Sequence, residues 1–473
     1  MKKIFAFLFF SILIAPVFSQ KQAADCNDSI EIVYVNKIYL NGNKITHDKI
    51  IYRELAVKAG DSLCYLTFMQ SLKKSKENLQ NTSLFNFVDI RDIQVVSKGK
   101  RFADVHINVS ERWYIWPMPI LELAERNPNA WWETKELSKI NYGMFFTWEN
   151  FRGRREALKI TAQGGYDEKF VFHYDIPFIN KLQTLGVIFG VGLTRNHEVT
   201  YQTINNRPVR YRDLEYIRHQ YYTNITLNIR KNIYTSHSFR FAYDDHQYGL
   251  KVFELNPQFD PKLNTIFKYF SLSYAYRNDH RDNKSYPLNG YYLDVILSKQ
   301  GLGISPEANV DQLTLSTKLR KYWNLDNQWY LAAGFTGRVA NTGLNPYFLN
   351  TGLGYHQDFV RGYEHYVIDA ETFALVKTDL KYALVQDRIN SISFLPSKFS
   401  KFHWSVYLSF FFDAAYSTTE LPQMTNTLQN ELLIGYGAGI NFVTYYDMVF
   451  RFEYSYNDKL KEKGFFMSFV SSL

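Results

Sequence analysis

The chain has 473 residues, 17% of them aromatic, with 36 Tyr and 38 Phe, and a formal net charge of +8. This length suggests two or more domains, or one large one. No segment has 18 consecutive apolar residues, which excludes membrane-spanning helices. Charges of both signs are scattered, and no compact Lys/Arg cluster with interleaved aromatics occurs, which argues against nucleic-acid binding.

The N-terminal residues have the pattern of a cleaved secretory signal. Lys2 and Lys3 provide a positive start, and a short apolar run follows from Ile4 to Phe18. We therefore predict a signal peptide at residues 1–19 and an N-terminal arm at residues 20–31. The mature chain is expected to leave the cytoplasm.

Composition places the exported chain in one of two classes. An aromatic-rich, polar-on-average chain is typical of an outer-membrane β-barrel, in which only every second residue of a strand faces lipid. A large secreted β-sandwich protein shares much of this composition. The two cysteines, Cys26 and Cys64, leave a similar choice open, because they can pair in an oxidising compartment or remain unpaired.

Residues 32–112 have the pattern of one small α/β domain. Apolar residues alternate in three segments, as in half-buried strands, and recur at helical spacing in two others. Thr46 is placed to cap the first helix, after the turn sequence at Asn41-Gly42. The predicted elements, in chain order, are a strand at Val35–Leu40, a helix from Thr46 to Val57, a helix at Leu66–Leu79, and strands at Val88–Val96 and Phe102–Val109.

Residues 113–137 are predicted to connect two domains. This segment contains Trp113, Trp116, Trp131 and Trp132 among several prolines. Tryptophan favours the membrane–water interface, so the segment is compatible with the rim of a barrel. Packing between two domains explains the tryptophans equally well.

Residues 138–473 are predicted to form the barrel. Strand patterns recur about every twenty residues, which gives about 16 strands, an even number as in closed bacterial barrels. In residues 140–148 every even position is large and apolar. Leu313, Leu315 and Leu319 likewise share one face of a strand. One face for lipid and one for a wet interior explains this alternation.

Two motifs lie in the second half of this region. The first, Phe359-Val360-Arg361-Gly362-Tyr363, belongs to a long loop, and the second, Phe411-Phe412-Asp413-Ala414-Ala415, ends a strand. Asp413 falls on the face opposite the strand's apolar residues, so periodicity directs it into the lumen. Gly435, Gly437 and Gly439 occupy alternate positions further on and leave room for a loop to approach the wall.

The small domain contains a series of short motifs in a fixed order: Ile38-x-Leu40-x-Gly42-Asn43-x-x-Thr46, Arg53-Glu54-Leu55, Gly60-Asp61, Leu84-Phe85 and Val105-x-Ile107-x-Val109-x-Glu111. In these motifs and the two barrel motifs, the chain resembles the BamA/TamA superfamily of outer-membrane proteins, with a single POTRA domain at residues 32–112. The resemblance implies that Arg361, Gly362 and Tyr363 lie in a loop folded into the lumen. It also implies that Arg361 pairs with Asp413, beside Phe411. Ala415 departs from the family pattern, which has glycine there.

The resemblance further implies a weak seam where the first and last barrel strands meet. We place these strands at about Lys139–Trp148 and Gly464–Ser471. The predicted seam residues are Tyr142, Gly143, Gly464, Phe466 and Phe469. A client strand can pair with an edge exposed there, because unpaired backbone groups are costly in lipid.

The expected function is therefore assembly or insertion of outer-membrane proteins, in the outer membrane of a Gram-negative bacterium with the POTRA domain in the periplasm. Expected partners are unfolded outer-membrane or secreted client proteins, membrane lipid and accessory periplasmic or lipoprotein subunits, but no nucleic acid. No catalytic or metal-binding motif occurs, so we expect neither enzyme activity nor a cofactor or metal. The alternatives are secretion of a partner protein through the pore, as in two-partner transporters, and a passive channel.

Overall fold

A computed structural model describes residues 32–97, 99–123, 140–260, 262–304, 310–341, 345–355, 358–391, 401–420, 424–444 and 448–470. The predicted signal peptide, the N-terminal arm and the pair Trp131–Trp132 lie outside these residues. The chain forms two compact units. The described residues of the smaller unit are 32–41, 55–76 and 89–108, apart from residue 98, and the larger unit contains the rest.

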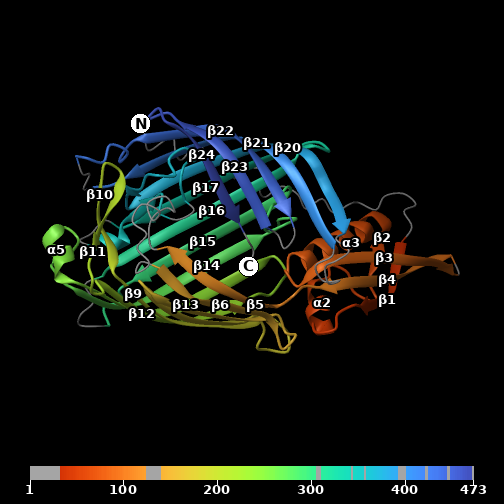
Figure 1. Ribbon diagram of the computed structural model, residues 1–473. Helices are drawn as coiled ribbons and strands as arrows, with labels where there is room; N and C mark the ends of the chain where they lie inside the picture. The colour runs from red at the N-terminus through yellow and green to blue at the C-terminus, as the bar shows by residue number, and fades with distance from the viewer. Residues whose placement is uncertain are drawn as a thin grey trace. The chain divides into compact units, whose positions relative to one another are not determined.

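The predicted small α/β domain is present. A four-stranded sheet has the order β2-β1-β4-β3, with β1 and β4 parallel (Figure 1). The predicted strand and helix order is confirmed, and one short strand, β2, is added to it. The elements are β1 (Ile32–Asn41), α2 (Asp48–Glu54), β2 (Ser62–Cys64), α3 (Tyr65–Gln80), β3 (Phe85–Ser97) and β4 (Lys100–Glu111). Cys64 is disulfide-bonded, and Cys26 lies outside the described residues.

Three residues that carried the POTRA resemblance have defined structural roles. Gly42 has φ of +93°, and a Cβ atom there would lie 2.0 Å from the carbonyl oxygen of Val109. The backbone N–H and the hydroxyl of Thr46 each donate to the carboxylate of Glu111 over 2.7 Å. The predicted capping role of Thr46 is wrong, because α2 begins only at Asp48 and the hydroxyl is committed to Glu111.

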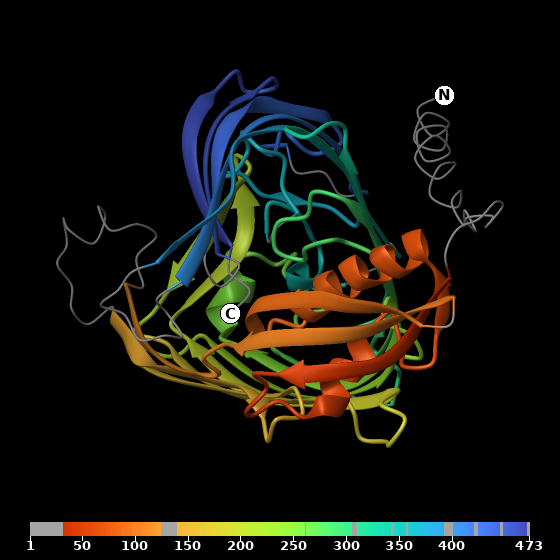
Figure 2. The ribbon, with the colours of Figure 1, turned by 90° about the vertical axis from the view of Figure 1, so that its right-hand side faces the viewer.

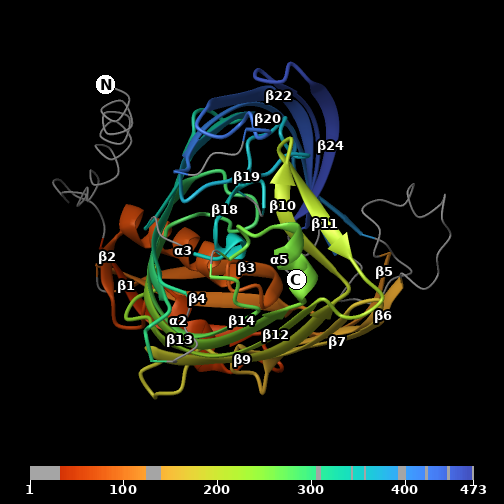
Figure 3. The same ribbon diagram turned by 90° about the vertical axis from the view of Figure 1, so that its left-hand side faces the viewer.

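The described residues also form a sixteen-stranded, barrel-like antiparallel sheet, in which neighbours follow one another along the chain. Figures 2 and 3 show this sheet from opposite ends, curved around an interior that connecting segments enter. The strands are β5 (Ile115–Leu123), β6 (Ile140–Phe151), β7 (Glu156–Gly165), β8 (Glu168–Ile176), β9 (Leu185–Asn196), β12 (Arg218–Ile229), β13 (Thr235–Tyr248), β14 (Ile266–Asp279), β15 (Gly290–Gln300), β16 (Gln312–Asn324), β17 (Trp329–Ala340), β20 (Thr372–Ser391), β21 (Lys401–Thr418), β22 (Leu432–Thr444), β23 (Met448–Asn457) and β24 (Lys463–Val470).

The start of this sheet differs from the prediction. Its first strand is β5, which lies inside the segment predicted as a connector at residues 113–137. The alternating prolines Pro117 and Pro119 made this segment look unlike a strand, because proline cannot donate to a sheet ladder. An edge strand tolerates proline, and β5 is such a strand.

The predicted alternation of faces is present in the structure. Tyr142 and Met144 are exposed on the outer face of β6, whereas the neighbouring Asn141 is buried. On β21, Phe410 and Phe412 are exposed and Asp413 is completely buried. Large apolar side chains therefore cover the outside of the sheet, and polar ones point inward.

Several connections form elements of their own, at one end of the sheet and inside its curve (Figures 1 and 3). They comprise the hairpin β10 (Glu198–Ile204) with β11 (Arg207–Arg212), the helix α5 (Leu250–Leu255), the 3-10 helix η2 (Tyr347–Leu349), and the strand pair β18 (Thr351–Leu353) with β19 (Ile368–Asp369) (Figure 3). Tyr248, Phe259 and Phe267 form a buried aromatic cluster that receives η2. None of the helices in the described ranges is long and apolar enough to cross a membrane.

Candidate functional site: the luminal loop anchor

The connection between β17 and β20 carries the first barrel motif. Near its centre the chain turns tightly at Gly362, whose φ of +95° favours glycine. The N–H of Tyr363 closes this turn by donating to the carbonyl of Val360 over 3.0 Å. Val360 and Tyr363 are buried in a cluster with wall residues such as Leu375 and Leu433. The turn thereby holds Arg361 against the inner wall of the sheet.

Arg361 forms a bidentate ion pair with Asp413 of β21. Its Nε donates to Oδ2 of Asp413 over 2.9 Å, and its Nη2 donates to Oδ1 over 2.6 Å. The backbone N–H of Arg361 donates to the same Oδ2 over 3.1 Å. Paired, charge-assisted hydrogen bonds of this kind fix geometry as well as charge. The structure thus brings together Arg361 and Asp413, the two residues that the sequence motifs predicted to pair.

Arg361 also contacts strands on either side of β21. Nη1 donates to Oδ1 of Asp379 on β20 over 2.9 Å and to Oε1 of Glu453 on β23 over 3.4 Å. Nη2 donates to the carbonyl of Thr378 over 3.1 Å. The guanidinium carbon lies 3.9 Å from the ring centre of Phe411, a cation–π distance. One loop side chain therefore links three wall strands.

The sequence prediction missed two members of this site. Neither Asp379 nor Glu453 was predicted to contact Arg361. Asp379 follows the rule that placed Asp413 in the lumen, because charged residues recur at alternate positions of β20, at Lys377, Asp379 and Lys381. What the sequence does not contain is the register that puts these carboxylates around one arginine.

Glycines in β22 make room for the loop. A Cβ atom on Gly435 would lie 1.8 Å from the carbonyl oxygen of Arg361, which is closer than any real contact. At Gly437 the nearest atom belongs to Tyr454 of the neighbouring strand, so this glycine does not face the loop in the same way. The predicted role of alternate glycines thus holds at Gly435.

Further contacts fix the loop just beyond the arginine. Nδ2 of Asn457 donates to the carbonyl of Gly362 over 2.7 Å, and the backbone N–H of Lys459 donates to the hydroxyl of Tyr363 over 3.1 Å. The N–H of Gly362 donates to Glu364 over 2.8 Å. Burial raises the pKa of Glu364 to about 7 against the lowering effect of that N–H, so this loop carboxyl exchanges its proton near neutral pH.

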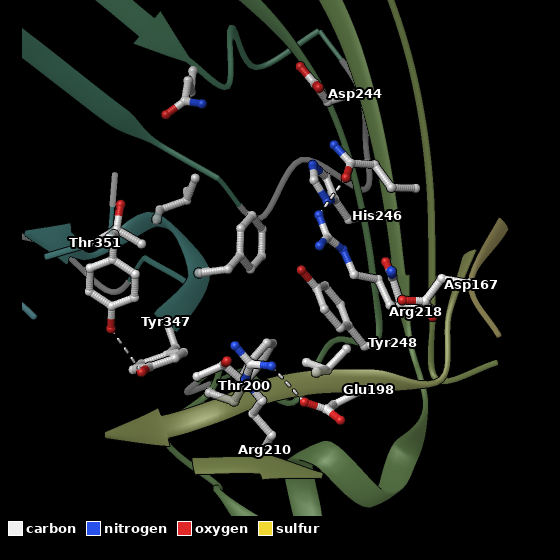
Figure 4. A pocket seen from close by; sticks show the side chains of 18 of the residues that line it. Asp167, Glu198, Thr200, Arg210, Arg218, Asp244, His246, Tyr248, Tyr347 and Thr351 are labelled. Carbon is white, nitrogen blue, oxygen red and sulfur yellow. Dashed lines mark hydrogen bonds and ion pairs between the residues drawn. The ribbon is translucent and has the colours of Figure 1, made fainter. Parts of the chain in front are cut away.

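The same connection has a second attachment on the other side of the interior. The N–H of Tyr347 donates to the carbonyl of Phe259 over 2.7 Å, and the ring of Phe348 packs on Tyr248. Beside this attachment lies a cavity of about 660 Å³, shown in Figure 4. Arg210 and Glu198 form an ion pair of 2.7 Å on its lining. The connection therefore spans the interior between two anchored points.

The two end strands of the sheet are β5 and β24, and within the described residues no ladder joins them (Figure 3). Gly464, Phe466 and Phe469 lie on β24, as predicted for the last strand. Tyr142 and Gly143 do not lie on the first strand: they belong to β6, which is hydrogen-bonded to β5 on one side and β7 on the other. Their assignment to the seam is wrong because β5 precedes them.

The part of the chain that the structure describes holds no group of three or more His, Cys, Asp or Glu side chains arranged to bind a metal ion. The carboxylates around Arg361 are instead compensated by arginine and by Lys377, whose Nζ lies 3.9 Å from Asp413. The arrangement is suited to holding a loop, since each of these charges has an opposite partner.

Two family models match the chain. Residues 33–112 match the POTRA model, described as a surface antigen variable number repeat, and residues 150–372 match the Omp85 superfamily domain. None of the curated proteins compared with the chain matches it significantly.

The solved structures to which the chain is similar include two kinds of outer-membrane protein. BamA from Haemophilus ducreyi lacking POTRA domains 1–3 is 14% identical, with 93% of this chain and 85% of that chain covered and a TM-score of 0.48. CdiB from Acinetobacter baumannii is 13% identical, with 93% and 73% covered and a TM-score of 0.47. CdiB from Escherichia coli is 8% identical, with 96% and 92% covered and a TM-score of 0.46.

Proposed function

Because the chain belongs to the Omp85 superfamily and carries one POTRA domain, we propose that it inserts client β-barrel proteins into the bacterial outer membrane. The superfamily contains outer-membrane transporters and insertases. Of these two activities, we propose insertion for this chain. In this scheme the POTRA domain lies in the periplasm, and its clients are unfolded outer-membrane proteins. Membrane lipid and accessory subunits complete the set of partners.

The observation that carries the proposal is the pair of end strands, β5 and β24. The other neighbouring strands of the sheet are joined by antiparallel ladders, but no ladder between β5 and β24 occurs in the described residues. Unpaired backbone groups in a membrane are costly, so such edges favour pairing with a further strand. A protein that inserts strands laterally requires edges of this kind, whereas a passive channel does not.

The Arg361 anchor supports the same proposal. The strands β20, β21 and β23, which Arg361 contacts, lie at the β24 end of the sheet. A wall held by an internal brace can keep its shape while its outer edge exchanges partners. We therefore assign Arg361, Gly362, Tyr363, Asp413 and Phe411 a positioning role and no catalytic one.

The test uses the purified full-length protein in lipid vesicles. We expect it to increase the insertion rate of a urea-denatured outer-membrane β-barrel about tenfold over empty vesicles, because it supplies an edge in place of a bare lipid surface. Insertion is measured as the protease-resistant, heat-modifiable fraction of the client. Transfer of the client into the vesicle interior without insertion would instead support protein secretion. A conductance for small solutes with neither effect would support a passive channel.

A further inference from the structure

One end of the large sheet carries a small cavity with an excess of positive charge. Because neighbouring strands are antiparallel and follow one another along the chain, the turns after β6, β12 and β14 lie at the same end of the sheet. The cavity between them has a volume of about 40 Å³, and all of its lining residues belong to the larger compact unit. Its charged lining residues are Arg155, Arg230, Arg281 and Lys284, with Glu54 and Asp279.

Two of the four basic side chains have a carboxylate of their own. Arg230 forms a bidentate ion pair with Glu54, in which Nη1 donates to Oε1 over 2.8 Å and Nη2 donates to Oε2 over 3.0 Å. Arg281 pairs with Asp279 in the same way, because its Nε and its Nη2 each donate to one carboxylate oxygen over 2.8 Å. Both carboxylates of the cavity are therefore already compensated.

Arg155, in the turn between β6 and β7, is not compensated in this way. Its Nη1 lies 3.4 Å from Oε1 of Glu54, the oxygen to which Arg230 donates over a shorter distance. Asp175 and Glu149 attract it electrostatically but form no ion pair with it. In the part of the chain that the structure describes, its guanidinium makes no further hydrogen bond. Most of its donors are therefore available to another acceptor.

Lys284, in the turn between β14 and β15, has an ammonium group without a partner among the described residues. Its backbone N–H donates to Oδ1 of Asn81 over 3.0 Å, and Nδ2 of Asn81 donates to the carbonyl of Asp282 over 3.0 Å. Asn81 thereby fixes the turn that carries Lys284. Desolvation, followed by the positive charge of Arg155, lowers the pKa of Lys284 to about 8. The fold thus holds two cations near each other without a counter-charge, which is costly unless an anion binds.

We propose that this cavity binds a phosphate group between the guanidinium of Arg155 and the ammonium of Lys284. A phosphate group carries about 1.5 to 2 negative charges near pH 7, which matches the two uncompensated cations, whereas chloride or a carboxylate supplies one. Arginine binds phosphate through paired N–H donors, and lysine binds it as a point charge. Since about 10–15 Å³ holds one water molecule, the 40 Å³ of the cavity admits about three water-sized groups, as in the oxygen atoms of a phosphate.

The phosphate links two turns that no strand ladder joins. Arg155 follows the second strand of the sheet, β6, and Lys284 follows the eighth, β14. Glu54, the last residue of α2, is held beside them by Arg230 from the turn after β12. The anion therefore completes a chain of ion pairs across this end of the sheet. The site does not depend on the proposed insertion function, since no client takes part in it.

Isothermal titration calorimetry tests the class of ligand. The full-length protein is purified in an uncharged detergent, dialysed free of phosphate and titrated with inorganic phosphate or acetate at constant ionic strength. We expect saturable binding of phosphate and at least about tenfold weaker binding of acetate, because acetate carries one negative charge and the site holds two cations. Competition with a soluble short-chain phosphatidic acid identifies the source of the group. Tighter binding than inorganic phosphate assigns it to a lipid headgroup, and weaker binding assigns it to free phosphate.

Two variants locate the site. Lys284→Gln and Arg155→Gln should each weaken phosphate binding at least about tenfold, because each loses a charge-assisted hydrogen bond. Lys284→Arg keeps the charge and should retain binding within a few-fold. Arg154→Gln is the control in the same turn, since Arg154 pairs with Glu156 and does not line the cavity.

Lys251→Gln is the control for the lysine, because Lys251 forms an exposed ion pair on α5. Heat-modifiable migration on a gel reports whether each variant is folded, and if one glutamine variant fails to fold, the other locates the site. Absence of saturable phosphate binding to the wild-type protein would overturn the proposal. Equal phosphate affinity in Lys284→Gln and Lys251→Gln would place the anion elsewhere and overturn it too. Equal affinities for phosphate, acetate and chloride would show only a non-specific attraction of anions, which also contradicts it.

Discussion

Replacement of Arg361 by alanine is expected to leave a folded sheet but to release the loop and reduce client insertion about tenfold. The reason is that the carboxylates of Asp379, Asp413 and Glu453 lose the arginine with which they form ion pairs. Arg361 is 7% exposed and Asp413 is completely buried. Removing one partner of a buried ion pair typically costs about 3–5 kcal/mol. This cost falls on the loop and its carboxylate partners, since the strand ladders do not include Arg361.

The measurement combines two readouts on the purified protein. Heat-modifiable migration on a gel reports whether the sheet is folded, and hydrogen exchange at residues 358–367 reports whether the loop is held. Arg361→Lys keeps the charge but cannot form the bidentate contact, so its insertion activity and loop protection should resemble those of Arg361→Ala more than those of the wild type. Arg91→Ala is the control, because Arg91 and Asp89 form an exposed ion pair worth little. Full insertion activity with a protected loop in Arg361→Ala would refute the anchor.

Replacement of Gly435 by valine is the second large effect that we expect. The new side chain would occupy the position of the Arg361 carbonyl oxygen, which lies 1.8 Å from the required Cβ. Valine suits a strand, so β22 itself should tolerate the change. The loop must therefore move away, and the variant should show the same loss of insertion and loop protection as Arg361→Ala.

Gly164→Val is the matched control for this variant. Gly164 also lies in a sheet strand, β7, but a Cβ atom there meets nothing within 4 Å. It should therefore retain wild-type insertion and loop protection. Equal behaviour of the two valine variants would show that the space beside Gly435 does not matter to the loop.

Much of the fold follows from the alternation of residue types. Tyr142 and Met144 on the outside and Asp413 on the inside were predictable because strand geometry fixes the face of every second residue. The glycine at position 435 was predictable as a position of close approach. These are local properties, and the sequence contains them directly.

Other features depend on which strands are neighbours. Asp379 and Glu453 meet Arg361 only because β20 and β23 lie on either side of β21 and β22. The first strand was misplaced because Pro117 and Pro119 weaken the pattern of β5, and their tolerance depends on β5 being an edge. The predicted seam residues on β24 do lie in the last strand. Tyr142 and Gly143 were assigned to the seam because β6 was taken as the first strand.

Depletion of this protein in its own bacterium shows whether it inserts β-barrels into the outer membrane. Every outer-membrane β-barrel is quantified by mass spectrometry before and after depletion, with rescue by the wild-type protein or by Arg361→Ala. We expect one or more β-barrels to disappear from the membrane, their precursors to accumulate in the periplasm, and only the wild-type protein to restore them. Unchanged levels of all outer-membrane β-barrels after complete depletion would contradict the proposed insertion function.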